Sequence, residues 1–195
     1  MRRLLIAVAG LALTAGCGMQ AVPAAEAPPV NGDPVVAAVA APVSLSIPAL
    51  NVTDKVVPVG ICDHKAPPRC EKGVGEMELP DISETGWYKL APKPGELGRA
   101  VLLSHVDWKG TPGAFKHLPN LKPGDTVTTR DADGAEVKFV VYDTQQILKV
   151  DFQKKTVPLL FGTATGREVA LVTCSGTVTD GNYDKNTIVR ARAAA

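Results

Sequence analysis

Short runs of apolar residues, separated by turn-forming residues, recur from residue 43 to the end of the chain. Residues 43–47 alternate apolar and polar positions, as in a half-buried strand, whereas 100–104 and 169–173 are continuously apolar, as in central strands. Helical periodicity is sparse, and one or two helical turns are predicted only within 111–118. The remaining predicted strands are 56–61, 87–90, 126–130, 137–142 and 187–189, which brings the count to about eight.

Two turn signals refine this prediction. The segment 131–134 reads Asp-Ala-Asp-Gly between two strands, which indicates a hairpin. Pro58 lacks a backbone donor, so the strand that contains it is predicted at an edge. Many short strands at close spacing predict an all-β fold, a closed or nearly closed eight-stranded β-barrel with short helical turns.

The N-terminus carries a targeting pattern. Arg2 and Arg3 precede an apolar stretch over 4–15, which is shorter than the roughly 20 residues of a membrane span. The stretch ends in Leu-Thr-Ala-Gly-Cys, which resembles the bacterial lipobox, although Thr14 stands where leucine is commonest. The resemblance implies that residues 1–17 are a lipoprotein-type signal peptide and that Cys17 is lipidated. The alternative is an ordinary secretory signal with an incidental cysteine, and both predict export.

The segment 18–42 is mostly Ala, Pro and Val, without a period of 2 or 3.6 residues. It is interpreted as a tether, which leaves 43–195 as the folded domain.

Composition narrows the class of protein. The 195 residues are 45% hydrophobic and 21% charged, with a net charge of +1, which does not favour a nucleic-acid partner because such proteins usually carry a basic face. Aromatic residues make up only 5% of the chain, while glycine and proline number 18 and 16, a combination that favours a turn-rich β fold over a helix bundle.

Export makes the remaining cysteines interpretable. Cys62 and Cys70 flank a short loop, and outside the cytoplasm such a pair predicts a disulfide. The alternative, a metal site formed by the two cysteines and His64, lacks a fourth ligand and a known spacing. No metal or cofactor is therefore predicted, and Cys174 is left unpaired.

Two predicted central strands end in reactive side chains. His105 follows the strand 100–104, and Cys174 follows 169–173. A thiol near pKa 8.5 is only a few per cent thiolate at neutral pH, so a nearby imidazole would activate it. The alternatives are a cysteine that packs as a small hydrophobe and a histidine on the surface.

Several motifs resemble the sortases, most closely the actinobacterial class F group. In order, they are Ile-Pro-Ala-Leu at 47–50, Gly-Trp-Tyr at 86–88, Pro-Gly-Glu-Leu-Gly at 94–98, Leu-Ser-His-Val-Asp at 103–107, the stretch 115–125 and Leu-Val-Thr-Cys-Ser-Gly at 171–176. The resemblance covers about 150 residues and implies a sortase barrel with His105 and Cys174 in its active site. It also implies a transpeptidase that acts through a thioacyl intermediate on an LPxTG-like sorting signal of exported proteins. The implied acceptor is an amine from peptidoglycan.

One departure concerns the arginine that sortases place at or just before the last strand. Class F relatives have a Tyr-Arg-Asp-Asn-like stretch there, whereas residues 183–186 read Tyr-Asp-Lys-Asn, with Asp184 at the arginine position. Arg190 is the predicted substitute, and Lys185 and Arg192 are weaker candidates.

Two functional hypotheses follow. The first is a sortase-type transpeptidase outside the cytoplasmic membrane, held there by lipid or secreted. The second is a non-catalytic lipoprotein of the same fold that binds peptide or wall material, motivated by Asp184 and by Ser175 where many class F members have glycine.

Overall fold

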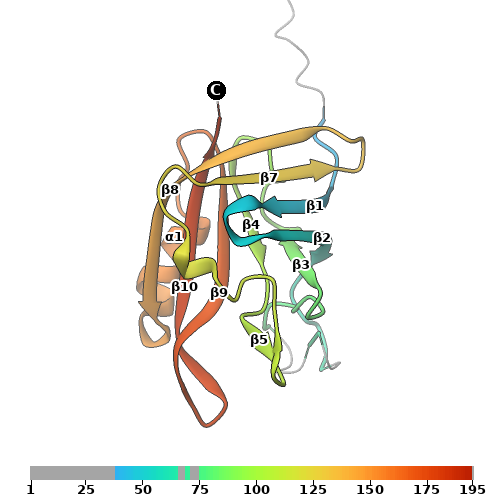
Figure 1. The fold of residues 1–195 in the computed structure, drawn as a ribbon. Helices are drawn as coiled ribbons and strands as arrows, with labels where there is room; N and C mark the ends of the chain where they lie inside the picture. The colour runs from blue at the N-terminus through green and yellow to red at the C-terminus, as the bar shows by residue number, and fades with distance from the viewer. Residues whose placement is uncertain (1–37, 66–68, 71–74, 195) are drawn as a thin grey trace, which may run out of the picture. The chain divides into compact units, whose positions relative to one another are not determined.

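A computed structural model describes residues 38–65, 69–70 and 75–194. Residues Ala38–Ala195 form one compact unit. Its strands close into a barrel in the order β1-β2-β3-β4-β9-β10-β8-β7, and β5 and β6 form a separate two-stranded sheet (Figure 1). The barrel strands are β1 (Pro42–Ile47), β2 (Val52–Val59), β3 (Glu84–Tyr88), β4 (Gly98–Leu103), β7 (Thr126–Asp131), β8 (Glu136–Leu148), β9 (Arg167–Thr179) and β10 (Asn182–Ala193). The remaining elements are η1 (Pro48–Leu50), β5 (Asp107–Trp108), β6 (Thr111–Pro112), η2 (Leu118–Asn120), η3 (Lys149–Asp151), η4 (Phe152–Thr156) and α1 (Val157–Phe161).

Most neighbouring barrel strands are antiparallel, but β2 and β3 are parallel, as are β4 and β9. The longest pairing joins β9 and β10, which continue past the barrel as a hairpin at the lower end of Figure 1. The β4–β9 pairing positions the candidate site, since the two strands run in the same direction and the residues that follow their last pair, Leu103 and Val172, lie at the same level.

Side chains alternate between the two faces of β9, as strand geometry requires. Val169 and Leu171 lie in the main core of the barrel. Ala170 packs in a second apolar cluster with Leu160 of α1, and Val172 lies against the same cluster. The alternation therefore places Cys174 on the face of Val172, outside the main core.

The connection between β8 and β9 is fastened to the barrel by a buried ion pair. Arg99 of β4 binds Glu168 of β9 through two nitrogens at 3.0 and 2.8 Å. Its guanidinium also donates to backbone carbonyls of Leu159, Gly162 and Thr163 in the connection. The connection thus has a fixed course across one face of the sheet.

The predicted all-β fold with an eight-stranded barrel is confirmed. The strands at 137–142, 169–173 and 187–189 are longer than predicted, because their polar ends pair with neighbours that no local pattern reveals. Within 111–118 the structure has β6 and turns rather than helix, and the helical turn η2 begins at its last residue.

Pro58 lies in a closed barrel rather than in an edge strand. It pairs with Trp87 of β3, while the β1–β2 pairing is confined to residues 52–55 of β2. The missing N–H of Pro58 therefore removes no ladder bond to β1, which explains why a proline is tolerated there.

The predicted signal peptide 1–17 with Cys17, and the tether up to residue 37, lie outside the described residues. The last part of the tether lies against the barrel: Lys93 Nζ donates to the Val39 carbonyl at 2.6 Å, and Ala132 N donates to the Ala41 carbonyl at 3.0 Å. Within the part of the chain that the structure describes, no helix is long and apolar enough to cross a membrane.

Candidate active site

Cys174 within β9 and His105 just after β4 lie at the same level of neighbouring strands. The parallel pairing of β4 and β9 runs as far as Leu103 opposite Val172. Two residues farther along, the strands carry His105 and Cys174, and Thr173 Oγ1 still donates to the Ser104 carbonyl at 2.7 Å. Because adjacent strands are about 5 Å apart, the two reactive residues lie next to each other just past the last paired residues of β4 and β9.

The Cys174 thiol is half-buried and is not part of a disulfide. Asn186 of β10 is its cross-strand partner. From beyond β10, Lys149 Nζ lies 3.5 Å from Sγ, close enough for a charge-assisted hydrogen bond to sulfur. The sulfur therefore has a cation as its polar neighbour.

The His105 ring is held by backbone and by an aromatic neighbour. Its Nε2 lies 3.0 Å from the Pro80 carbonyl. Since a carbonyl only accepts, Nε2 must carry the proton in this contact. Trp108 lies against the ring at a centroid distance of 5.7 Å. A cavity of about 270 Å³ lies beside His105 and is lined by Leu79, Pro80, Asp81, Ile82 and Trp108.

A hydrogen bond ties the β9–β10 hairpin to the segment that follows His105. The Tyr183 hydroxyl donates to Asp107 Oδ2 at 2.6 Å. This bond raises the pKa of Tyr183 above 10.0, and partial burial and the negative charges of Asp107 and of a Cys174 thiolate raise it further. The hairpin is thereby attached next to the two reactive residues.

This bond gives a pH-dependent prediction. Because the folded state favours protonated Tyr183, the bond stabilises the fold below pH 10 and is lost as pH rises through the folded pKa. Phenolate absorbance of the wild type minus that of Tyr183→Phe should therefore titrate above pH 10 in the folded protein. If this absorbance difference titrates at or below pH 10, the hydrogen bond between Tyr183 and Asp107 is contradicted.

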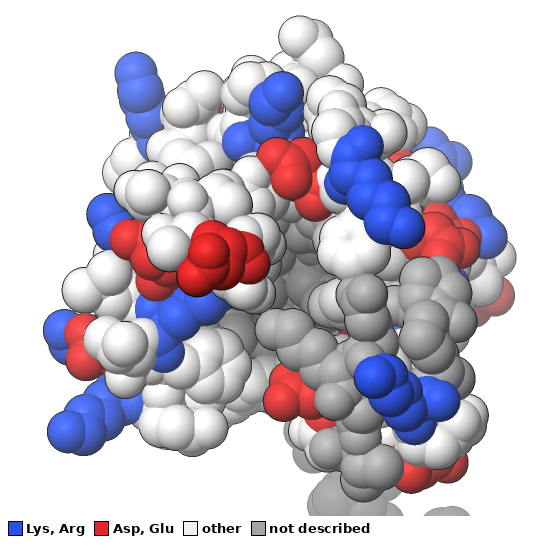
Figure 2. Space-filling view, turned by 90° about the horizontal axis from the view of Figure 1, so that it is seen from below, with Lys and Arg blue, Asp and Glu red and all other residues white. Residues whose placement is uncertain are grey.

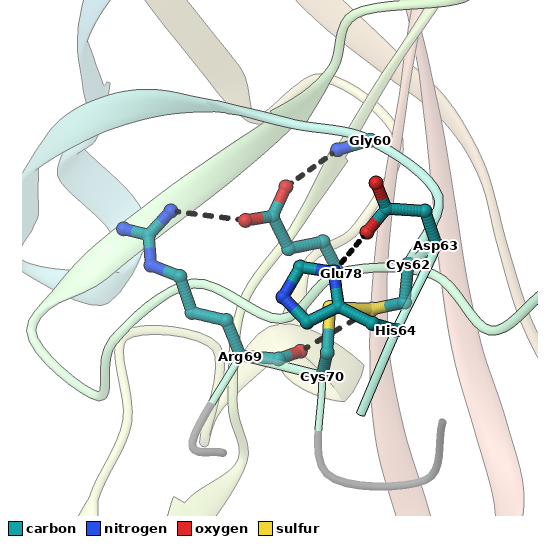
Figure 3. Close-up of a disulfide and its surroundings, with 7 residues drawn as sticks. All are labelled: Gly60, Cys62, Asp63, His64, Arg69, Cys70 and Glu78. Carbon is teal, nitrogen blue, oxygen red and sulfur yellow. Dashed lines mark hydrogen bonds and ion pairs between the residues drawn. A yellow bond between two sulfur atoms is a disulfide. The ribbon is translucent and has the colours of Figure 1, made fainter. Parts of the chain in front are cut away.

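The predicted disulfide between Cys62 and Cys70 is confirmed, with a Cα–Cα distance of 5.6 Å (Figure 3). Both sulfurs are consumed in this bond, so neither is available as a thiolate ligand beside His64, which contacts Asp63 at the surface. The disulfide segment, which connects β2 and β3, is attached to the neighbouring strands by hydrogen bonds from and to charged side chains. Glu78 accepts from the Gly60 amide at 2.9 Å, and Arg69 NH2 donates to Glu84 of β3 at 2.9 Å.

The disulfide segment leads directly to the histidine. The Leu79 amide donates to the Arg69 carbonyl at 2.9 Å, and the next residue, Pro80, supplies the carbonyl that holds His105. Cys62–Cys70 therefore stiffens the wall on the histidine side of the candidate site.

Arg190, the predicted substitute arginine, lies elsewhere on β10. It pairs with Ala170, four residues before Cys174 on β9 and so about 13 Å away along the strand. Its guanidinium binds Asp143 at 3.0 and 2.7 Å and stacks on Tyr142. The structure brings Cys174 and His105 together, whereas Arg190 is directed to an acidic partner on β8.

Of the two weaker candidates, Lys185 pairs with Ser175, the residue after Cys174, whereas Arg192 is engaged elsewhere. Arg192 stacks on Tyr142 and lies 3.8 Å from Glu168. Asp184, at the position where the sequence resemblance predicts arginine, accepts from the Thr177 amide at 2.7 Å within the hairpin.

Figure 2 views the protein from the lower end of Figure 1, where the β9–β10 hairpin and β5 lie. The face is hollowed near its centre, and acidic and basic side chains are interspersed around the hollow. No single sign of charge dominates the described part of this face.

Comparison with known proteins identifies the family. A sequence model described as the sortase domain matches residues 45–194, most of the chain. The chain belongs to the sortase family. Among curated proteins none matches this sortase.

Solved sortases share its fold. Sortase A from Corynebacterium diphtheriae has a TM-score of 0.56 at 16% identity, and sortase C-1 from Actinomyces oris has 0.54 at 18%. The match covers 78% of this sortase in both cases, and 60% and 73% of the two other chains. Sortase D5 from Clostridium perfringens, described as a transpeptidase, has a TM-score of 0.54 at 13% identity and is covered over 78% of both chains. This sortase spans less than two thirds of the length of the Corynebacterium protein.

Sequence reasoning did not find Lys149 in the site of this sortase. The predicted strand ends at residue 142, well before Lys149, and no motif surrounds this lysine. Only the extension of β8 to Leu148 and its pairing with β10 bring it near β9. No local signal in the sequence predicts that approach.

Proposed function

We propose that this sortase is a cysteine transpeptidase that cleaves an LPxTG-like sorting signal and transfers the acyl part to an amine of the cell wall. The observation that carries the proposal is the common level of His105 and Cys174, each two residues past the last pair of the parallel β4–β9 ladder. Family membership adds the reaction class, because sortases generally are cysteine transpeptidases.

The reaction divides into two acyl transfers. The Cys174 thiolate attacks the carbonyl carbon of the threonine, forming a C–S bond while the carbonyl electrons move to oxygen. When the carbonyl reforms, the C–N bond breaks and protonated His105 gives its proton to the departing amine. An incoming amine then attacks the thioester, His105 takes its proton, and Cys174 leaves as thiolate.

The surroundings of the His105 ring suit a general acid–base group. Its ring lies between the Pro80 carbonyl and Trp108, beside the cavity that Asp81 and Ile82 line. We propose that this cavity admits the amine, because a base must lie within reach of the proton that it removes.

Replacing His105 with alanine should reduce the transfer rate by about 10²–10⁴-fold, the usual effect of losing a general acid–base group. His117→Ala is the matched control, because that histidine is the cap residue before η2 and is not placed in the site. Equal rates for the two variants, measured by product mass, would contradict the assignment.

The motifs at 103–107 and 171–176 support membership of class F, and the lipobox-like segment ending at Cys17 supports lipid anchoring outside the cytoplasmic membrane. The domain boundaries proposed from the sequence, 1–17, 18–42 and 43–195, fit that arrangement. A mass spectrum of the exported protein tests it through lipid on Cys17.

The function is tested by incubating the protein with an LPxTG-type peptide and a small amine and following the product by mass. A product that joins the peptide, up to its threonine, to the amine supports the transpeptidase. Peptide binding without product supports the second hypothesis, a non-catalytic lipoprotein. That hypothesis is favoured by one observation, the carboxylate of Asp184 where class F relatives carry a cation.

A further inference from the structure

We propose that Lys149 is the catalytic cation of this site, stabilising the Cys174 thiolate and then the oxygen of the tetrahedral intermediate. The inference rests on the proposed function and assigns to Lys149 the part that the sequence assigned to Arg190. The observation behind it is the 3.5 Å contact between Lys149 Nζ and Cys174 Sγ.

The barrel register produces this contact. Lys149 begins η3 directly after Leu148, the last residue of β8, which pairs with Lys185 of β10. Asn186, the next residue of β10, pairs with Cys174. Lys149 therefore reaches over β10 to the strand beyond it, a backbone separation of about 10 Å that only a long side chain spans.

The charge of Lys149 is available to the sulfur. Among the described residues, its ammonium has no carboxylate within ion-pairing distance, and nearby Asp151 is taken by Lys155 at 2.9 Å. Arg190, in contrast, is neutralised by Asp143 at 2.7 Å. Lys149 is also half-buried, so its charge is less screened than that of a fully exposed lysine.

The position of the Lys149 ammonium also suits the step in which the tetrahedral intermediate forms. When the thiolate attacks, negative charge moves from sulfur to the oxygen bonded to the same carbon, two bonds away. An ammonium on a flexible four-carbon stem can follow that movement without rearrangement of the backbone. A preorganised donor at such an oxygen is worth on the order of 10²–10³ in rate.

Three variants test the proposal. Lys149→Met removes the charge at nearly constant length, Lys149→Arg keeps it, and Lys154→Met removes an equivalent charge from an exposed position of η4. The first readout is the ratio of Cys174 alkylation rates by iodoacetate, an anion, and iodoacetamide, which is neutral. A local cation attracts only the former, so the ratio reports charge at the sulfur and not the integrity of the fold.

Lys149→Met should lower this ratio about three- to tenfold, while Lys149→Arg and Lys154→Met should stay within about twofold of the wild type. A ratio that is the same in Lys149→Met and Lys154→Met overturns the proposal. This readout needs no sorting peptide, so it stands or fails separately from transpeptidation.

The second readout is peptide transfer. Lys149→Met should lower kcat by about 10²–10³-fold with little change in KM, and Lys149→Arg should recover most of the loss. Full activity in Lys149→Met overturns the oxyanion role. If the wild type shows no transfer but Lys149→Met still lowers the alkylation ratio, the proposed transpeptidase function is refuted. The contact between the Lys149 ammonium and the Cys174 thiolate is then still supported.

Discussion

Replacing Cys174 with alanine is expected to reduce peptide transfer to background, a loss of about 10⁴-fold or more. The thiolate sulfur forms the acyl bond in the proposed reaction, and alanine offers no atom that could replace it. The measurement is product mass under conditions in which the wild type completes many turnovers.

Ser175→Ala is the matched control for this variant. Its hydroxyl oxygen is buried and, among the described residues, has no hydrogen-bond partner. Removing it should leave both the fold and transfer intact, since no bond is lost. Residual transfer in Cys174→Ala at the level of Ser175→Ala would exclude Cys174 as the nucleophile.

Replacing Arg99 with methionine is expected to lower the free energy of unfolding by about 3–5 kcal/mol, the usual effect of removing one member of a buried ion pair. The side chains of Arg99 and Glu168 are only 5% and 3% exposed. Without the guanidinium, the Glu168 carboxylate is left with Tyr142 as its closest donor, at 3.0 Å. Three carbonyls of the β8–β9 connection lose their donor as well.

Denaturant unfolding of Arg99→Met measures this loss, with Arg130→Met as the control. Arg130 forms an ion pair with Glu136 in which both side chains are more than half exposed, and its loss should cost no more than about 1 kcal/mol. Similar losses in the two variants would contradict a clamping role for Arg99.

The same pair predicts sensitivity to acid. Burial alone would raise the pKa of Glu168, but hydrogen bonds from Arg99 and Tyr142 and the charge of Arg99 outweigh it and hold this pKa below 4.5. Since the folded pKa is lowered, the pair stabilises the protein above pH 4.5 and is lost as pH falls through the folded value.

Local sequence patterns were sufficient to predict the barrel. Alternation at 43–47 and continuous apolar runs at 100–104 and 169–173 reflect burial on one or both faces, which is a property of the strand itself. The two reactive residues could also be named, because each follows such a run. The Cys62–Cys70 bond was predictable from close spacing together with the predicted export signal.

What escaped prediction depends on pairing between distant strands. The approach of Lys149 to Cys174 requires β10 to lie between β8 and β9 in a particular register. The same register directs Arg190 to Asp143, a pairing that the two-residue period along β10 cannot reveal. The buried Arg99–Glu168 clamp joins strands 69 residues apart for the same reason.

The most direct test of the central claim is an intact-mass spectrum of the protein after brief incubation with an LPxTG-type peptide and no added amine. The account predicts an acyl adduct that maps to Cys174 on peptide digestion and disappears on addition of hydroxylamine, which cleaves a thioester. It also predicts no adduct on Cys174→Ala. Peptide that binds the wild type without forming an adduct would contradict the account and favour a binding protein of the sortase fold.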